Sequence, residues 1–169
     1  AKPNRYGDDV QSFNAGGLGN SCAIEIGSLC FTAPFSPTPM TKAECEQAVA
    51  EGKLGIKGCG YEQDYWAGAV KQCGGVSKMP TMAQLAELAS QMYVGNPSIG
   101  AMENKANIQY DPNSPVSKAL GLTPDFYLYS GEEYSSYHAY SRTFYTPYSY
   151  CGPNGERYIS DYQAVCVGE

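Results

Sequence analysis

The sequence lacks a long hydrophobic run. A helix that crosses a membrane needs about 18 consecutive apolar residues, and no such stretch occurs. Basic residues are also few: 11 Lys and Arg stand against 17 Asp and Glu, which leaves a net charge of -6. Nucleic acids and anionic membranes both select a basic face, so we expect neither nucleic acid nor membrane contact by this chain. The opening residues, AKPNRYGDDV, are polar and do not form a signal peptide, so we expect the targeting segment of an exported protein to have been cleaved.

Metal-binding patterns are missing too. His138 is the one histidine and no Cys-x-x-Cys occurs, so the usual tetrahedral zinc ligand sets are absent and we expect no metal and no cofactor. The seven cysteines instead indicate an oxidising compartment, and we expect an extracellular or cell-surface protein. Their odd number leaves one thiol over, and several pairings of the other six are open on the residues alone.

The 169 residues suffice for one packed domain, or one domain with an appendage. With 19 glycines and 11 prolines the composition is typical of a loop-rich mixed fold, and we expect the α+β class. The clearest element is a helix that begins at Met82, because Thr81 and Gln84 form a capping box. Its apolar residues recur at helical spacing and predict one buried stripe: Met82, Leu85, Leu88, Ala89 and Met92.

Other elements follow from local signals. Cys22 to Cys30 predicts a small hairpin, and the Thr41 and Glu44 capping box predicts a helix ending near Gly52. A further helix is expected from Glu62 to Cys73, with glycines as its stop. We expect residues 1–20 to be a polar lead-in, residues 94–115 to be a long surface excursion, and residues 126–167 to alternate between short strands and loops.

Tyrosine is concentrated near the C-terminus, where residues 127–162 hold ten of the 15 tyrosines. They stand among serine, glycine and asparagine, whereas a core would use Val, Ile and Leu. Rigid tyrosine rings with small polar neighbours are the composition of an antibody paratope. We expect eight of these rings to be partly exposed on one face: Tyr134, Tyr137, Tyr140, Tyr145, Tyr148, Tyr150, Tyr158 and Tyr162. The alternative is a β-rich half that packs tyrosine inside and along its edges.

The order of elements carries a family resemblance. A helix, Cys73, two glycines, MPT, an amphipathic helix, an excursion and strands ending in QAVCVG resemble the C-type lectin-like fold, in the branch shared with formylglycine-generating enzymes. The resemblance covers about Glu62 to Val167. It implies short helices packed on small antiparallel sheets, with a domain at 61–169 and a variable ligand-binding surface at 127–162.

The tyrosine-rich end more narrowly resembles the variable region of proteins diversified by diversity-generating retroelements. In that family, template adenines are mutated, so AAC codons become NNC codons. Such codons encode Tyr, Ser, His, Gly, Cys, Asp or Asn, but not Lys, Met, Trp, Gln or Glu. Between Tyr134 and Tyr162, Glu156 is the only member of the excluded set.

Residues 1–60 lie outside this resemblance. Their polar lead-in, disulfide hairpin and short helix are similar to the globular part of a type IV pilin-like subunit whose hydrophobic N-terminal helix is absent. That likeness implies a pilus-like assembly through the missing helix.

The C-type lectin-like resemblance implies a long disulfide between Cys73 and Cys166. Locality then pairs Cys22 with Cys30 and Cys45 with Cys59, and Cys151 is left over in the variable stretch.

We expect a secreted or surface-displayed hypervariable protein that binds a protein or cell-surface ligand. The expected ligand-binding residues are Tyr129, Tyr134, Ser136, Tyr137, His138, Tyr140, Ser141, Tyr145, Tyr148, Tyr150, Gly152, Asn154, Tyr158, Ser160 and Tyr162. The alternatives are a structural type IV pilus or fibre subunit, whose tyrosines pack between neighbours, and a copper-dependent oxidase related to formylglycine-generating enzyme.

Enzymatic activity is not expected. An oxidase would use Cys151 and Cys166, yet the tryptophan-rich motifs of the enzyme branch are absent and Cys166 occupies a structural half-cystine position of the resembled fold. A hydrolase would need His138 with Ser141 and Asp161, but a lone histidine in a diversified surface is more often a contact residue. The calcium signatures of sugar-binding lectins are also missing, so we expect the pair Glu132 and Glu133 to be a solvated turn.

Overall fold

The computed structural model describes residues 22–103, 108–146 and 148–168, which form a mixed α+β fold. The helices within this part are α2 (Lys42–Glu51), α3 (Tyr65–Cys73), the 3-10 helix η2 (Val76–Lys78), α4 (Met82–Ser90), α5 (Ile99–Glu103) and α6 (Pro115–Leu120). The strands are β1 (Ile24–Ile26), β2 (Leu29–Phe31), β3 (Met40–Thr41), β4 (Gln63–Asp64), β5 (Phe126–Glu133), β6 (His138–Phe144), β7 (Ser149–Glu156) and β8 (Val167–Gly168). They pair into small antiparallel sheets, as expected for this fold class.

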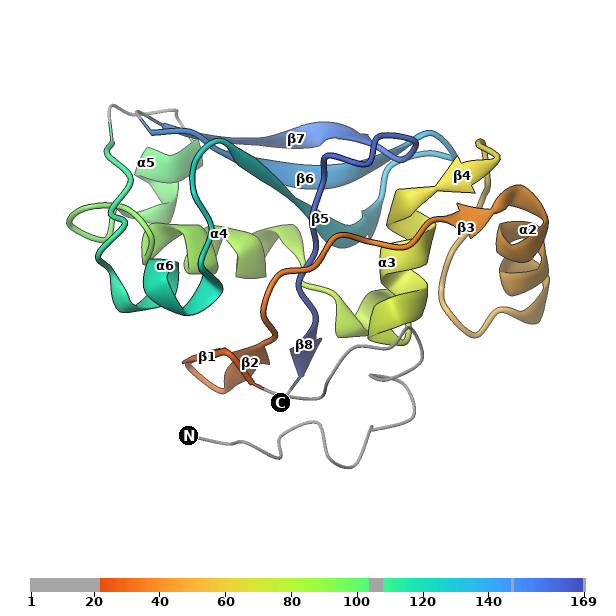
Figure 1. The fold of residues 1–169 in the computed structure, drawn as a ribbon, viewed down its shortest axis with the longest axis horizontal. Helices are drawn as coiled ribbons and strands as arrows, with labels where there is room; N and C mark the ends of the chain where they lie inside the picture. Colours follow the sequence, from red (N-terminus) through yellow and green to blue (C-terminus); the bar gives the residue numbers. More distant parts are fainter. Residues whose placement is uncertain (1–21, 104–107, 147, 169) are drawn as a thin grey trace.

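The sheet β5-β6-β7 separates the core from the opposite surface. In Figure 1 it runs along the top, with α4, α5 and α6 beneath it. Phe126 lies opposite Phe144, and their rings stack with centroids 4.4 Å apart above the helices. Because side chains alternate along a strand, the next residues, Tyr127 and Thr143, point to the other face. One face of the sheet therefore closes the core and the other is available for a site.

Helix α4 begins where the sequence predicts. The Thr81 hydroxyl oxygen accepts a hydrogen bond from the Gln84 amide, and the Thr81 amide donates to Oε1 of Gln84, which completes the capping box. Leu85 and Leu88 are fully buried against the lower face of the sheet, together with Met92. The predicted helix start and the predicted apolar stripe are confirmed.

The other two predicted helices are also present. The Thr41 and Glu44 box starts α2, and Gly52 ends it in a left-handed conformation. Helix α3 begins at Tyr65, three residues after the expected Glu62, because Gln63 and Asp64 pair with β3. The Asp64 carboxylate caps α3 by accepting from the Ala67 amide at 2.8 Å.

The disulfide hairpin β1-β2 does not stand alone. β2 pairs with β8 at the C-terminus, and farther along Phe35 bridges Ala164. This pairing joins the segment before residue 60 to the strand that ends the resembled domain. The predicted lead-in at 1–20 lies outside the described residues.

The expected surface excursion at 94–115 is wrong in part. The segment contains α5 and the first residue of α6, and it buries Met102 and Tyr110 in the core beneath the sheet. Tyr110 meets the buried Tyr93 ring edge-on and donates its hydroxyl proton to the Leu122 carbonyl. No apolar periodicity marks Met102 and Tyr110 in the sequence, because Met102 lies in α5 and Tyr110 lies outside it, in a single β-bridge with Tyr93.

All three expected disulfides are present. The Cα atoms are 5.6 Å apart in Cys22–Cys30, 6.0 Å in Cys45–Cys59 and 5.4 Å in Cys73–Cys166. Cys151 remains outside these bridges, in β7, as expected. Three disulfides are compatible with an extracellular location.

Removing the long bridge should cost more stability than removing a short one. Cys73 and Cys166 are 93 residues apart in sequence, so their bridge restricts the unfolded chain strongly. The double variant Cys73→Ala/Cys166→Ala should lose about 4 kcal/mol of unfolding free energy in chemical denaturation. The matched control Cys45→Ala/Cys59→Ala opens a separation of 14 residues and should lose about 3 kcal/mol. A control that loses clearly more would contradict this ranking.

Candidate ligand-binding site

All eight tyrosines expected at the surface are at least partly exposed. Tyr134, Tyr137 and Tyr158 are exposed by half or more, and the other five are half-buried. Among the other expected ligand residues, Asn154 and Ser160 are exposed, and Ser136, His138 and Gly152 are half-buried.

Part of this tyrosine-rich region forms a pocket of about 380 Å³ on the upper face of the sheet. We call it the tyrosine pocket; it is lined by Tyr127, Thr143, Tyr145, Tyr150, Asn154, Glu156, Ile159, Asp161 and Tyr162. Four of these nine residues were expected to bind ligand: Tyr145, Tyr150, Asn154 and Tyr162.

The floor of the tyrosine pocket is one row of the sheet. Tyr127 on β5 lies opposite Thr143 on β6, which in turn lies opposite Tyr150 on β7. Their neighbours on the same strands, Phe126 and Phe144, face the core. The same alternation therefore places phenyl rings inside and phenol rings outside.

The walls come from two segments that return to the sheet. Tyr145 lies in the β6-β7 loop, where the buried Tyr93 hydroxyl donates to its carbonyl at 2.6 Å. On the other side, residues 157–163 run back along β5, and the amides of Tyr129 and Gln163 donate to Gln163 and Tyr127 respectively. Each wall is thus held through its own backbone atoms, by the Tyr93 hydroxyl on one side and by backbone amides on the other, independently of the side chains that it displays.

Tyr162 anchors the returning segment. Its ring stacks on Tyr129 with centroids 4.8 Å apart, and its hydroxyl donates to the Asn154 carbonyl at 2.9 Å. Tyr162 therefore has two tasks, since it covers the sheet and lines the tyrosine pocket.

The position of Tyr162 over the sheet explains why two of the expected ligand-binding residues are buried. Tyr129 and Ser141 were expected in the ligand surface, but the side chain of Tyr129 is fully buried and that of Ser141 nearly so. They point to the upper face of the sheet, where Tyr162 closes over them. Tyr129 donates its hydroxyl proton to the Glu156 carbonyl at 2.7 Å, so it is a core residue.

A second group of rings lies beside the tyrosine pocket. Tyr61 contacts Tyr137 and Tyr158, with ring centroids 5.4 and 4.9 Å apart. The hydrogen bond between Tyr158 and Glu156 raises the pKa of the Tyr158 phenol and connects this group to the wall of the tyrosine pocket. Sequence reasoning missed Tyr61 because it lies outside the tyrosine-rich stretch.

Two phenols of the tyrosine pocket, Tyr145 and Tyr162, keep their protons at neutral pH. Burial raises the pKa of both Tyr145 and Tyr162 above the usual value of 10.0. The lining carries two carboxylates, Glu156 and Asp161, and it includes no lysine or arginine. The tyrosine pocket therefore presents neutral rings, hydroxyl groups and negative charge.

Sequence reasoning also missed five lining residues: Tyr127, Thr143, Glu156, Ile159 and Asp161. Strand alternation from Phe126 would have indicated Tyr127 and Thr143, because they fall on the face opposite the phenylalanines. Ile159 and Asp161 carry no such signal, since they reach the site only through the return of the chain.

A buried arginine holds that return. Arg157 is fully buried, and its Nε and Nη2 atoms lie 2.9 and 2.7 Å from Oδ2 of Asp64. Its Nη1 atom donates to Glu133 at 2.9 Å and to the Ser135 carbonyl at 2.7 Å. The guanidinium also lies 4.6 Å from the centre of the Trp66 ring. Arg157 thereby joins α3, the β5-β6 turn and the segment after β7.

The two acids before this turn were expected to be solvated, and Glu133 contradicts this. Its carboxylate pairs with Arg157 and accepts from the amides of Lys57 and Gly58. Glu132 is exposed, but it accepts from the Met82 amide at the start of α4 at 2.7 Å. Burial raises the pKa of the Asp64 carboxyl, while its hydrogen bonds with Arg157 act in the opposite direction.

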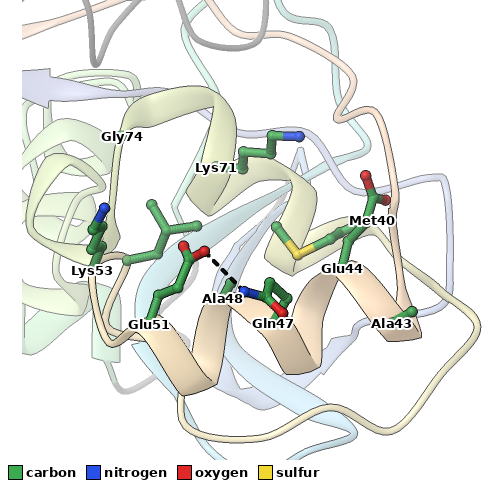
Figure 2. A pocket seen from close by; sticks show the side chains of 10 residues that line it. Met40, Ala43, Glu44, Gln47, Ala48, Glu51, Lys53, Lys71 and Gly74 are labelled. Carbon is green, nitrogen blue, oxygen red and sulfur yellow. Dashed lines mark hydrogen bonds between the residues drawn. The ribbon is translucent and has the colours of Figure 1, made fainter.

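A larger hollow of about 790 Å³ lies away from the tyrosines, between α2 and α3. Figure 2 shows Lys71 of α3 across it from Glu44, Gln47 and Glu51 of α2, where Gln47 donates to Glu51 at 3.1 Å. Its lining holds no aromatic residue and mixes acids with lysines. Sequence reasoning did not predict this hollow, because its two walls are 20 or more residues apart in the chain.

The structure also shows where the residues of the enzymatic alternatives lie. Cys166 is bonded to Cys73 and not to Cys151, and Ser141 of the hydrolase alternative is buried. Within the described residues, no cluster of three or more His, Cys, Asp or Glu side chains could hold a metal ion. The same part of the chain contains no helix long and apolar enough to cross a membrane.

Comparison with protein-family models, with curated proteins and with solved structures finds no match to this chain.

Replacing Arg157 should destabilise the whole upper side of the molecule. Arg157→Met leaves Asp64 and Glu133 without their buried counter-charge, and the unfolding free energy should fall by about 3 to 5 kcal/mol. Lys71→Met also removes one positive charge, from an exposed position on α3, and should change it by no more than about 0.5 kcal/mol. Chemical denaturation compares the two variants; equal small effects would show that the buried ion pairs do not hold the fold.

The division between core and surface tyrosines can be measured in the same way. Tyr129→Ala removes a fully buried ring and should cost about 3 to 5 kcal/mol. Tyr134→Ala removes a ring that is 57% exposed and should cost less than about 1 kcal/mol. Comparable losses in thermal and chemical unfolding would contradict the assignment of Tyr134 to the surface.

Proposed function

We propose that this protein is a hypervariable binding protein, secreted or displayed at the cell surface, that grips a protein or cell-surface ligand with its tyrosine-rich face. One observation carries the proposal: the eight tyrosines of 134–162 are all at least partly exposed, and Tyr145, Tyr150 and Tyr162 line a pocket whose floor is a sheet with its opposite face in the core. The proposal includes the C-type lectin-like fold and diversification by a retroelement.

Tyrosine suits this task for physical reasons. Each ring offers a large contact area with two rotatable angles, so little entropy is lost on binding, and each hydroxyl can donate and accept hydrogen bonds. A buried core would waste those hydroxyl groups, since each would need an internal partner. The exposed rings of Tyr134, Tyr137 and Tyr158 are the ones best placed to reach a partner.

The scaffold supports variation at this face. The two capped helices, α3 and α4, and the Cys73–Cys166 bridge lie in the two buried clusters. The walls of the tyrosine pocket are held largely by backbone atoms, which any side chain supplies. Replacement of exposed side chains would therefore leave the frame intact, as a diversified protein requires.

The arrangement of α3, α4 and the long bridge supports the C-type lectin-like part of the proposal. The half-cystine at the end of α3 is joined to the last strand region, as the resemblance implies. Display at the surface is supported by the three disulfides, which suit an oxidising environment.

Sequence variation in a natural population tests the proposal. If the tyrosine face is diversified, the gene should show substitutions almost only between about Tyr129 and Tyr162, while residues 62–92 stay constant. Sequencing the gene and its flanks from many isolates makes the measurement. It should also find a nearby reverse transcriptase and a near-copy of the 3′ end. Substitutions spread evenly along the gene would refute diversification by a retroelement.

A further inference from the structure

The lining of the tyrosine pocket combines two features that select the same kind of ligand. Four tyrosine rings form its floor and walls, and Glu156 and Asp161 supply negative charge, with no lysine or arginine among the described residues that line it. We propose that the tyrosine pocket binds a cationic side chain, the guanidinium of arginine or the ammonium of lysine, presented by a protein ligand. The identity of the ligand as a protein rests on the proposed function, whereas affinity for the cation is a property of the tyrosine pocket itself.

The aromatic walls favour a cation. The face of a phenol ring carries negative electrostatic potential, so a cation above the ring is attracted to it. Tyr127 and Tyr150 lie in one row on the sheet, and Tyr145 and Tyr162 rise beside them from the two returning segments. Tyr127 and Tyr162 contact each other with ring centroids 5.2 Å apart, so a cation reaches these rings from the cavity and not from between them. Arginine gains most, because its planar guanidinium also stacks on aromatic rings.

The carboxylates exclude a neutral ligand of the same shape. A ligand that fills the tyrosine pocket removes water from Glu156 and Asp161, and an uncompensated carboxylate loses favourable hydration. Arg157 cannot supply the compensation, since its guanidinium is fully buried and bound to Asp64 and Glu133. A cationic ligand replaces the lost hydration with hydrogen bonds and with opposite charge, whereas a sugar hydroxyl supplies hydrogen bonds alone and an aliphatic group supplies neither.

The size agrees with one side chain. At about 380 Å³ the tyrosine pocket is near the lower limit of small-molecule sites, which begin at roughly 300 Å³. It accepts the end of a long side chain while the exposed rings of Tyr137 and Tyr158 contact the surrounding surface of the same partner. The tyrosine pocket would thus anchor one residue of a larger interface.

Blocked amino acids test the inference directly. The full chain, with carbon-13 in its tyrosine rings, is titrated with Nα-acetyl-arginine amide and followed by nuclear magnetic resonance. We expect saturating shifts of the Tyr150 and Tyr162 ring signals, with a dissociation constant on the order of millimolar. The citrulline derivative has the same shape without the charge and should bind at least about tenfold more weakly. The lysine derivative should bind, and added salt should weaken both cations.

Charge variants locate the site. Asp161→Asn changes an exposed side chain and should weaken arginine binding several-fold, and Glu156→Gln should do the same. Glu87→Gln makes the same change of net charge at an exposed position on α4 and should leave the affinity unchanged. Glu87→Gln weakening binding as much as Asp161→Asn would overturn the inference, because the effect would then come from overall charge.

The other possible results distinguish failure of the cation site from failure of the proposed function. Equal binding of the arginine and citrulline derivatives, or no shift of either pocket ring up to about 100 mM probe, would refute a cation site. These results would leave the proposed function standing, since that rests on variation of the gene in populations. Conversely, selective arginine binding with a gene that does not vary would keep the cation site and refute the hypervariable function.

Discussion

The ion pairs between Arg157, Asp64 and Glu133 hold together the part of the molecule that carries the site. Arg157 is the basic partner of both acids, and it also donates to the carbonyls of Gly58 and Ser135. Removing one ion of such a group leaves the others buried without a counter-charge. The stability that each of the three charges contributes therefore depends on the other two. The segment after Arg157 is thereby directed back over the sheet, where Tyr162 and Asp161 reach the tyrosine pocket.

The two faces of the sheet β5-β6-β7 have different roles: the lower face packs in the core and the upper face carries the tyrosine pocket. Phe126, Leu128 and Phe144 pack on the helices below, and this packing is fully sealed. Above, Tyr127 and Tyr150 face a pocket. A substitution at an exposed position above the sheet changes what can bind, whereas one below it, or at the covered Tyr129, changes whether the chain folds. This separation is what a protein needs if its surface varies while its frame stays constant.

The same division explains why tyrosine alone is a poor guide to function. Tyr93 and Tyr129 use their hydroxyl groups to hold carbonyls inside the structure, and burial raises the pKa of both phenols. Tyr134 and Tyr158 have the same side chain but lie at the surface. What distinguishes them is coverage by the returning chain. Glu156 and Asp161 lie in the tyrosine pocket with Tyr145, Tyr150 and Tyr162, and the proposed cation site rests on this combination.

The sequence by itself determined the elements whose causes are local. Both capping boxes, the glycine that ends α2 and the disulfide hairpin depend on residues within a few positions of each other, and all were predicted. The long bridge was predicted from a family resemblance and is present. Only the tertiary structure decided which tyrosines are covered, that Glu133 pairs with Arg157, and that Ile159 and Asp161 line the tyrosine pocket. The reason is that these facts depend on contacts between segments distant in the chain, and no spacing within a segment specifies where another segment will lie.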